Sequence, residues 1–465
     1  MVVSTDNTVL TESLTSEREF RCNEMFFSTT DKCGKITSGN DVFVRVSAFA
    51  EDELVGSPHN VIRHPDMPRA VFRLVWAKLE AGQSVAGYVK NRAKDGRYYW
   101  VMAYITPMEG GYLSIRLKPS TQTIPIVADL YREMAKVEQA AGENRVAGMD
   151  QSTTLLLTTL KTLGFGSYED FMRHSLNLEM RHRDQELERT NQTMFPSKPE
   201  AAVPGAMADV LQRVYQAAYK VYGQVNRLVQ HLGQLGATSK LLREKSQSLT
   251  DMTGSFRLIS FNSAIEASRL GHVGASLGVI SVQMGDTSSQ IGEVVSGLKD
   301  HLTKSSLELQ EILFMLSALR LQLEMLLSFC CDLLRKNDMD ITVLQRVLSL
   351  EQALAHTNRQ VQSKLGNFGD NLGSLDDSTE GLRRAMLTMQ VATVSGLVEA
   401  NRIQNSSFQQ IFQEVRQEID KTALNLKGLL DSMGQMAALV KGAPAVAEDV
   451  ALTCLNVERE LAKMG

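Results

Sequence analysis

Proline is missing from a long part of this chain. The 465-residue sequence has 10 prolines, and none lies between Pro204 and Pro444. Proline disrupts helices because it lacks a backbone N–H and its ring clashes with the preceding turn. The proline-free part is rich in Leu, Gln, Ala, Met and Glu, which favour helix. It is therefore predicted to consist mostly of long helices.

Cysteine is also scarce, and its spacing excludes two common roles. The five cysteines are odd in number and form no CxxC pair, which argues against a disulfide framework and against structural zinc. A reducing cytoplasm is the predicted location. The cysteines are Cys22, Cys33, Cys330, Cys331 and Cys454.

Neither acidic nor basic residues predominate in this chain. The net charge is -4 with 22% charged residues, and no basic stripe marks a nucleic-acid partner.

The N-terminus lacks a basic run followed by an apolar core, so no signal peptide is predicted. The most apolar stretch, Ile312 to Leu334, contains Arg320 and Glu324. Each charge costs about 2.5 to 3.5 kcal/mol at a bilayer centre. A buried amphipathic helix is predicted, with a membrane span as the alternative.

Composition divides the chain into an α+β domain and a helical module. Both tryptophans lie in the first 120 residues, with short strand-like runs FFSTTD, GKITSG and GYLSIRL. GYVKNRA and RYYWVMAYITP flank a KDG turn and predict a β-hairpin, while DVFVRVSAF and PRAVFRLVWAKLEAG show helical spacing. We predict a multidomain chain with an antiparallel sheet covered by helices on one face. The predicted segments are an N-terminal segment (1–25), the α+β domain (26–120), a helical connector (121–190), a linker (191–205) and a helical module (206–465).

A heptad seam follows the linker. Apolar residues recur at strict sevens, with further apolar residues at the alternate core position, as in coiled coils. Ser239 and Ser246 weaken the alternate position, which favours a multi-helix bundle whose partners come from the chain or from a second copy. A homodimer is predicted. The seam residues are Leu228, Leu235, Leu242, Leu249 and Phe256, with Val221, Val225 and Leu232 at the alternate position.

The run NVIRHPDMPRAVFRLVWAKLEAG, with GND before it and KNRAKDGRYYWV after it, resembles the FAD-binding PAS domain of bacterial aerotaxis receptors. The match covers about Phe26 to Lys118 and is nearly gap-free. The resemblance implies an FAD pocket lined or supported by Arg63, His64, Asp66 and Trp76, with Asn40, Phe72 and Asn91 as further contacts. Taken alone, Phe72 and Trp76 also suit a plain core, Arg63 a salt bridge, and His64 a cap.

Two other ligand types can be weighed. A light-sensing flavin domain needs a cysteine poised to bond the flavin, and neither Cys22 nor Cys33 has the Asn-Cys-Arg-Phe-type context. A haem sensor needs an axial histidine, which His59 or His64 can supply. Haem b therefore stays open as the alternative cofactor.

The run FRLISFNSAIEASRLGHVGASLGVI, from Phe256 to Ile280, resembles the hairpin tip of methyl-accepting chemotaxis receptors. The resemblance implies that the tip binds a chemotaxis histidine kinase and its coupling protein. Gly271 and Gly274 allow a tight turn between helices. Glu266 and Arg269, three residues apart on one helical face, are the predicted partner-binding residues. The apolar residues Ile259, Ile265 and Val279 are predicted to pack inward.

The module also departs from that family. MTGSF replaces the polar run that usually precedes the tip, and His272 and Ala275 replace the usual acidic and basic residues. Far more of the chain follows the tip than lies between the linker and the tip. The excess is predicted to fold back as further helices, with a turn in the glycine-containing stretch from Gly366 to Gly381.

Together these features predict a soluble cytoplasmic redox or oxygen sensor of aerotaxis or chemotaxis, and no enzyme. FAD in the PAS domain would set a signal that the helices carry. Three alternatives remain: a haem-binding gas sensor, a helical scaffold dimerised by an empty PAS domain, and a flavoenzyme. Against the last, we find no GxGxxG after a strand, no CxxC and no acid/base cluster.

Overall fold

The computed structural model describes residues 16–190, 195–199, 205–336 and 341–462, and divides the chain into two compact units. Unit 1 comprises Met1–Arg227, Leu313–Val361 and Ala445–Gly465, and unit 2 comprises Leu228–Ile312 and Gln362–Pro444. Most of the predicted linker, residues 191–194 and 200–204, lies outside the described residues.

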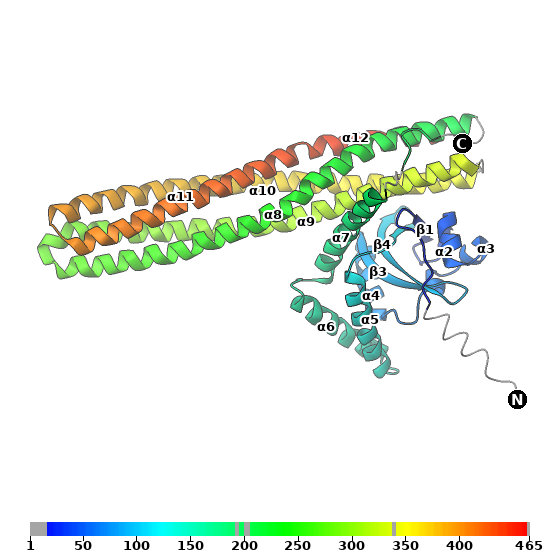
Figure 1. Cartoon of the computed structure of the whole chain (residues 1–465), viewed down its shortest axis with the longest axis horizontal. Coiled ribbons are helices and arrows are strands. Elements are labelled where there is room, and N and C mark those ends of the chain that lie inside the picture. Colours follow the sequence, from blue (N-terminus) through cyan, green and yellow to red (C-terminus); the bar gives the residue numbers. More distant parts are fainter. Residues whose placement is uncertain (1–15, 191–194, 200–204, 337–340, 463–465) are drawn as a thin grey trace. The chain divides into compact units, whose positions relative to one another are not determined.

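Unit 1 contains a five-stranded antiparallel sheet in the order β2-β1-β5-β4-β3 (Figure 1). The predicted hairpin is confirmed, since β3 and β4 pair from Val85↔Ile105 to Arg92↔Tyr98 across a turn where Gly96 has φ 89°. That left-handed conformation favours glycine. The strands are β1 (Met25–Asp31), β2 (Ile36–Gly39), β3 (Val85–Arg92), β4 (Tyr98–Met108) and β5 (Gly111–Leu117).

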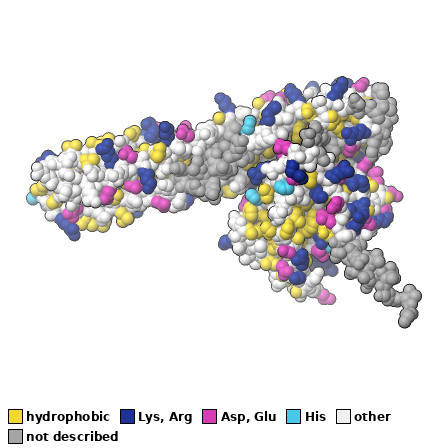
Figure 2. Space-filling model, in the orientation of Figure 1, with side chains coloured by type: hydrophobic (Ala, Val, Ile, Leu, Met, Phe, Trp, Pro, Cys, Tyr) yellow, Lys and Arg dark blue, Asp and Glu magenta, His cyan; other side chains and the backbone are white. Residues whose placement is uncertain are grey.

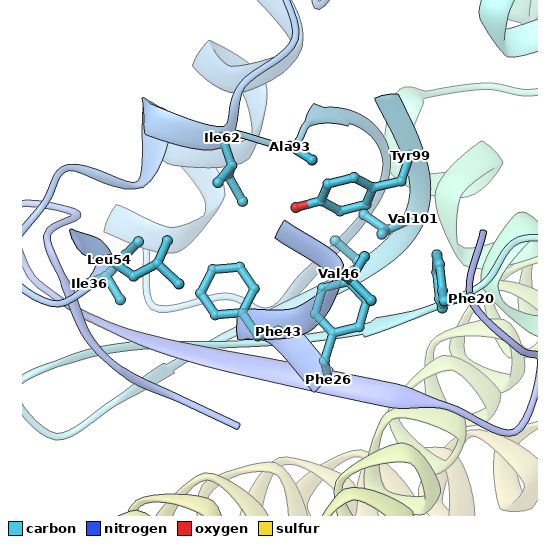
Figure 3. Packing of buried hydrophobic residues seen from close by; sticks show 11 residues of the cluster. Phe20, Phe26, Ile36, Phe43, Val46, Leu54, Ile62, Ala93, Tyr99 and Val101 are labelled. Atoms are coloured by element: carbon cyan, nitrogen blue, oxygen red, sulfur yellow. The ribbon is translucent and has the colours of Figure 1, made fainter. Parts of the chain in front are cut away.

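Short helices cover one face of this sheet, as predicted for an α+β domain. They are α2 (Asp41–Ser47), α3 (Glu51–Leu54), the 3-10 turn η1 (His59–Ile62) and α4 (Arg69–Glu80). Aromatic rings form the core between helices and sheet: Phe26 stacks on Phe43 at 6.0 Å between ring centroids, and Tyr99 lies edge-on to Phe26 at 6.3 Å (Figure 3). Burial of such rings dominates the stability of a small domain.

Helices also pack on the opposite face of the sheet. The region after β5 forms α5 (Thr123–Ala140), α6 (Arg145–Thr162) and α7 (Tyr168–Arg189), as its helical pattern predicts. Because side chains alternate along a strand, Phe26 and Phe27 point to opposite faces. Phe27 packs edge-on against Phe329 at 5.3 Å, and Tyr104 on β4 lies 6.0 Å from Phe314. The sheet therefore has helices of unit 1 on both of its faces, and α4 also contacts α6.

The proline-free region is helical, as predicted. It forms α8 (Ala206–Arg269), the 3-10 turn η2 (Gly271–Gly274), α9 (Ala275–Lys336), α10 (Ile341–Arg402) and α11 (Ser406–Lys441), and α12 (Ala443–Ala462) follows. In unit 2, α8 with α9 and α10 with α11 form two hairpins that turn at the same end (Figure 1). Acidic and basic side chains are interspersed on the face shown in Figure 2.

The heptad seam is buried wherever its side chains are described. Leu228, Leu249 and Phe256 are buried, as are Val221 and Val225. The side chains of the remaining seam positions lie outside the described ones, namely Leu232, Leu235, Ser239, Leu242 and Ser246.

Two predictions about the helices are wrong. Gly366 to Gly381 form no turn but lie inside α10, where buried Phe368 and Leu375 continue an apolar seam; packing outweighs the helix cost of glycine. Ile265 and Val279 do not pack inward, being 42% and 70% exposed.

One described helix, Gly271–Arg335, is long and apolar enough to cross a membrane by length and composition alone. The mean hydropathy of its most apolar window is 1.6, and 83% of that window is buried inside the protein. Buried core helices pass the same test, so the feature is weak evidence for a span.

Candidate functional site

A cavity of about 380 Å³ lies between the sheet and helix α4. Its volume lies within the range of sites for small organic ligands. The strands contribute alternate residues, such as Val89 and Asn91 of β3 and Ala103 and Ile105 of β4. The remaining wall consists of Thr30, Cys33, Gly34, Pro58, His59, Asn60, Arg63, Phe72, Val75, Trp76, Leu79, Tyr112, Ser114 and Arg116.

The cavity is apolar on its α4 side. Trp76 packs edge-on against Tyr112 at 5.3 Å, and Phe72 lies beneath the Arg63 guanidinium at 4.3 Å. Gly34 has φ 78°, and a Cβ there would come within 3.3 Å of the Trp76 ring. A larger residue at position 34 would therefore strain the backbone and press on Trp76.

Polar atoms line the opposite wall without protein partners. Asn91 Nδ2, Ser114 Oγ and Arg116 Nη1 are buried, and none has a hydrogen-bond partner among the described residues. A buried donor that lacks a partner costs about 1 to 3 kcal/mol, and a charged one costs more. Such atoms in a cavity fit a ligand with hydrogen-bond acceptors or a negative charge.

Arg116 is the charged group of this wall. Its guanidinium carbon lies 5.6 Å from the Phe26 ring centroid and 5.3 Å from the Phe43 ring centroid, and its Nη2 donates to Ser28 Oγ at 2.9 Å. Burial lowers the pKa of Arg116 to about 10, so it remains a cation at neutral pH.

His59 shares this environment as a neutral acceptor. Its Nε2 lies 2.6 Å from Arg116 Nη2, and because a guanidinium only donates, Nε2 accepts. Burial, followed by the charge of Arg116, lowers the pKa of His59 to about 3. Nε2 is therefore engaged, and axial haem ligation through it would require the Arg116 contact to break.

Four of the seven predicted cofactor residues line this cavity: Arg63, Phe72, Trp76 and Asn91. One donor of the Arg63 guanidinium is already engaged, since Nη2 donates to the Met67 carbonyl at 2.6 Å. It also forms an isolated β-bridge with Asn91, which brings the two residues together.

His64 and Asp66 lie apart from this cavity, on a neighbouring depression lined also by Lys90 and Trp100. Burial and Lys90 lower the pKa of His64 to about 4, so its ring is neutral at pH 7. Asp66 is exposed and pairs with Lys90 Nζ at 2.6 Å. Both residues brace the segment between η1 and α4.

Asn40 does not line the cavity either. It is the N-cap of α2, and its Oδ1 accepts from Phe43 N at 3.3 Å and Phe27 N at 3.2 Å. Its Nδ2 donates to the Met25 carbonyl at 3.2 Å. Asn40 therefore fixes α2 to β1.

Sequence reasoning missed Arg116, Ser114 and Tyr112, which all lie on β5, and it did not place Cys33 in the cavity wall. The available signal was Arg116 itself, the one charged residue in the strand-like run GYLSIRL. An arginine there is costly unless something pairs with it.

On the far face of the sheet, a buried carboxylate connects β3 to α7. Tyr88 of β3 donates to Glu179 Oε1 at 2.8 Å, and Glu179 is fully buried. Glu179 also accepts from the backbone N–H of Ser120 at 2.7 Å and from Thr121 Oγ1 at 2.6 Å. The Glu179 carboxylate thus links β3, the segment after β5 and α7 through hydrogen bonds.

One turn later, α7 contacts α9 through a second buried network. Arg183 Nη1 donates to Glu324 Oε2 at 2.5 Å, and Arg320 Nε donates to Glu324 Oε1 at 2.8 Å. Arg320 Nη1 also donates to Asp184 at 2.7 Å. All four residues belong to unit 1.

The predicted partner-binding residues sit at the end of α8 in unit 2. Arg269 Nη1 donates to Glu266 Oε2 at 3.2 Å, and the Arg269 side chain is 74% exposed while Glu266 is about half as exposed. The pair is accessible on one face, as the three-residue spacing predicts. Among the described residues, no group of three or more His, Cys, Asp or Glu can hold a metal ion.

The sheet, its helical cover and the cavity between them define a PAS domain, which is followed in the sequence by long helices. The family model described as PAS fold matches residues 36–113. The chain is 47% identical over 112 residues to the aerotaxis receptor of Escherichia coli, so this domain is of the aerotaxis-receptor type, as the resemblance indicates. It is also 24% identical over 145 residues to the biofilm dispersion protein BdlA of Pseudomonas aeruginosa.

These matches are local. They cover 23% of this chain and 22% of the aerotaxis receptor, and 30% of this chain and 35% of BdlA. Among solved structures, the PAS domain of a Colwellia psychrerythraea protein matches with TM-score 0.18 and 19% identity, covering 20% of this chain and 85% of that one. The light-state LOV domain of Aureochrome1 matches with TM-score 0.20 and 17% identity, covering 26% and 95%.

Proposed function

We propose that the chain is a redox or oxygen sensor that holds FAD in the PAS cavity and acts in aerotaxis or chemotaxis signalling. The observation that carries the proposal is the set of unpartnered buried donors on Asn91, Ser114 and Arg116 in one cavity. The cavity lies in the region most similar to an aerotaxis receptor. Those donors suit a ring whose polar edge accepts hydrogen bonds and whose charge changes.

FAD supplies a group whose charge and hydrogen bonding differ between oxidised and reduced forms. In this proposal, Trp76 and Phe72 form the apolar side of the slot. Arg116 stabilises negative charge on the ring, since a buried cation without a counter-charge is otherwise costly. Arg63 binds the ring or the diphosphate through its paired donors. His64, Asp66 and Asn40 act as supports of the pocket wall.

The signal is proposed to cross the sheet through β3. Asn91 lines the cavity, and Tyr88 three residues earlier contacts Glu179 on the other face. When the proposed hydrogen bond between FAD and Asn91 changes, β3 shifts, and the Tyr88 hydroxyl shifts with it. From Glu179 the shift passes along one face of α7 to Arg183, which holds Glu324 of α9. About 1.4 kcal/mol of differential interaction changes a two-state equilibrium tenfold, so a single altered hydrogen bond is sufficient.

Hydrogen exchange tests this relay. The purified chain is compared in air and after reduction with dithionite. We expect peptides of β3 and of α7 around Glu179 to change exchange rate between the two states. Equal rates in both states, with a flavin that has visibly been reduced, would refute the relay.

The output is proposed to run through the tip of α8, where Glu266 and Arg269 contact a chemotaxis histidine kinase or its coupling protein. Charge reversal in Arg269→Glu is expected to weaken co-sedimentation with the coupling protein and to leave helicity and FAD content unchanged. Helices that melt in this variant would show Arg269 to be structural. A cytoplasmic location, a homodimer and the lack of enzymatic turnover stay predictions from the sequence.

Haem b is the second candidate cofactor, favoured by the histidine in the cavity wall. It would need His59 to exchange its Arg116 contact for iron. A Soret band in the purified chain would support it. An empty pocket would favour a helical scaffold.

A further inference from the structure

Unit 2 is built from two copies of one hairpin pattern. The buried positions of α8 and α10 correspond at one constant offset along the sequence. Leu249, Phe256, Ser260, Ser263 and Ala267 of α8 match Leu382, Met389, Thr393, Gly396 and Ala400 of α10. Apart from Gly396, all of these residues have buried side chains. Gly396 lies against the Phe412 ring, and a Cβ at this position would collide with the ring. The two helices therefore present the same inner face.

The returning helices repeat as well. Buried residues of α9 and α11 follow the same alternation of four and three, as a heptad seam requires. In α9 these are Leu277, Ser281, Met284, Ser288, Ile291, Val295, Leu298 and Leu302, and in α11 they are Phe408, Phe412, Val415, Ile419, Thr422, Leu426, Leu429 and Met433.

Both tips end in the same way. In the last turn of α8, Arg269 pairs with Glu266 at 3.2 Å, and in the last turn of α10, Arg402 pairs with Glu399 at 2.7 Å. A left-handed residue follows each helix end, Gly271 at φ 58° and Gln404 at φ 51°. Ser260 and Thr393 likewise donate to the carbonyl four residues earlier, at 2.8 and 2.7 Å. The segment SGLVEANR of α10 is thus the counterpart of NSAIEASR in α8.

The two hairpins complete one four-helix bundle within the chain. Ser288 Oγ of α9 donates to the Thr253 carbonyl of α8 at 3.3 Å. Asn425 of α11 donates to Ser248 of α8 at 3.2 Å, and Lys304 of α9 donates to Asn371 of α10 at 3.0 Å. From Ser248 towards the tip, α8 therefore finds its packing partners in the same chain.

Each tip also exposes an apolar stripe at corresponding positions. Leu258, Phe261 and Ile265 of α8, and Val391, Val394 and Val398 of α10, are each between 42% and 66% exposed. Their spacing of three and four places each set on one helical face, beside the Glu–Arg pair. Contiguous exposed apolar residues rimmed by charge are typical of protein-binding surfaces.

We infer that the α10–α11 tip is a second docking face for the partner proposed for the α8–α9 tip, so that one chain binds two copies of it. The inference rests on the proposed function, because it takes the coupling protein as the partner. The same stripe and the same charge pair occur twice, so one protein surface fits both. The faces are unequal: exposed Val279 and Val282 of α9 correspond to exposed Gln410 and Gln413 of α11. The second tip therefore binds more weakly.

The test is a calorimetric titration of the full-length chain with purified coupling protein from the same genome. We expect two molecules bound per chain in the wild type, and one in either Phe261→Glu or Val394→Glu. The double variant should bind none. Leu424→Glu is the matched control: Leu424 is 71% exposed outside both stripes, and its counterpart in α9 is already Glu293. Circular dichroism checks that each variant stays helical.

One molecule bound per chain, lost in Phe261→Glu and kept in Val394→Glu, would overturn the second face and leave the proposed output standing. Loss of binding in Leu424→Glu would show that any added charge disrupts the bundle, and would also count against the assigned faces. Absence of wild-type binding would overturn both this inference and the proposed partner.

Discussion

Arg183 of α7 donates to Glu324 of α9 at 2.5 Å, and both side chains are almost completely buried. Burial alone would raise the pKa of Glu324, but the guanidiniums of Arg183 and Arg320 hold it below its ordinary value. Glu324 therefore stays ionised and balances two buried cations. This contact ties the helix that receives the Tyr88 hydrogen bond, through Glu179, to the long helix α9.

Removing that charge is expected to be costly. Glu324→Gln leaves Arg183 and Arg320 with one carboxylate, Asp184, between them, and breaking a buried ion pair costs about 3 to 5 kcal/mol. Urea unfolding should show a lower midpoint. Glu186→Gln, which removes an exposed pair with Arg189 within α7, is the control and should leave the midpoint unchanged. Equal midpoints for Glu324→Gln and wild type would refute the role of the network.

The cavity assignment predicts which residues retain FAD. Trp76→Ala and Arg63→Ala are expected to lower the FAD content of the purified chain without melting the helices of unit 2, since that unit is compact by itself. Arg73→Ala is a matched control, because Arg73 lies on the same helix α4 but binds Asp150 and Thr153 outside the cavity. Stoichiometric FAD in both cavity variants would contradict the assignment.

His59 predicts a pH dependence of stability. Its pKa is lowered to about 3 in the folded state, against about 6.5 in an unfolded chain. Between these values only the unfolded state binds the proton, so the free energy of unfolding falls as pH decreases from 6.5 towards 3. The slope is about 1.4 kcal/mol per pH unit for each such histidine. His64, whose pKa is lowered to about 4, adds to it.

The variant His59→Gln keeps an acceptor for Arg116 but does not titrate. Unfolding at several pH values, monitored by fluorescence of Trp76 and Trp100, should show a slope smaller by about one proton. An unchanged slope would mean that His59 is not held neutral.

A variant of Tyr88 is expected to lose the proposed signal relay while it keeps FAD binding. Tyr88→Phe removes the donor to Glu179 while the cavity, on the other face of β3, is untouched. FAD content should stay normal, and the redox-dependent change in hydrogen exchange of α7 should disappear. Tyr98→Phe on β4 is the control and should keep that change. A full redox response in Tyr88→Phe would exclude this path.

Much of the fold follows from local pattern. The KDG hairpin, the GYLSIRL strand and the proline-free helices were predictable because turn chemistry and apolar spacing act over a few residues. The unbroken helix through Gly366 to Gly381 was not predictable in this way, since burial of Phe368 and Leu375 against other helices stabilises it. Ile265 was misplaced for a similar reason: the inward face of α8 is set by Ser263 and Ala267, small residues that allow close packing.

The site was predictable only in part. The resemblance carried by the run NVIRHPDMPRAVFRLVWAKLEAG implies that Phe72 and Trp76, which lie on α4, line the pocket. Arg116 is distant in sequence and comes to the cavity only because β5 pairs between β1 and β4, which no local pattern specifies. His64 and Asp66 follow Arg63 closely in sequence but line a different depression, because the chain turns here and Met67 N–H donates to the His64 carbonyl at 3.1 Å.

The absorption spectrum of the purified full-length chain, followed by mass analysis of the released chromophore, tests the central claim most directly. The account predicts the bands of an oxidised flavin, bleaching on reduction, and a chromophore with the mass of FAD at one per chain. A Soret band, or a colourless protein that takes up no FAD when it is supplied, would contradict it.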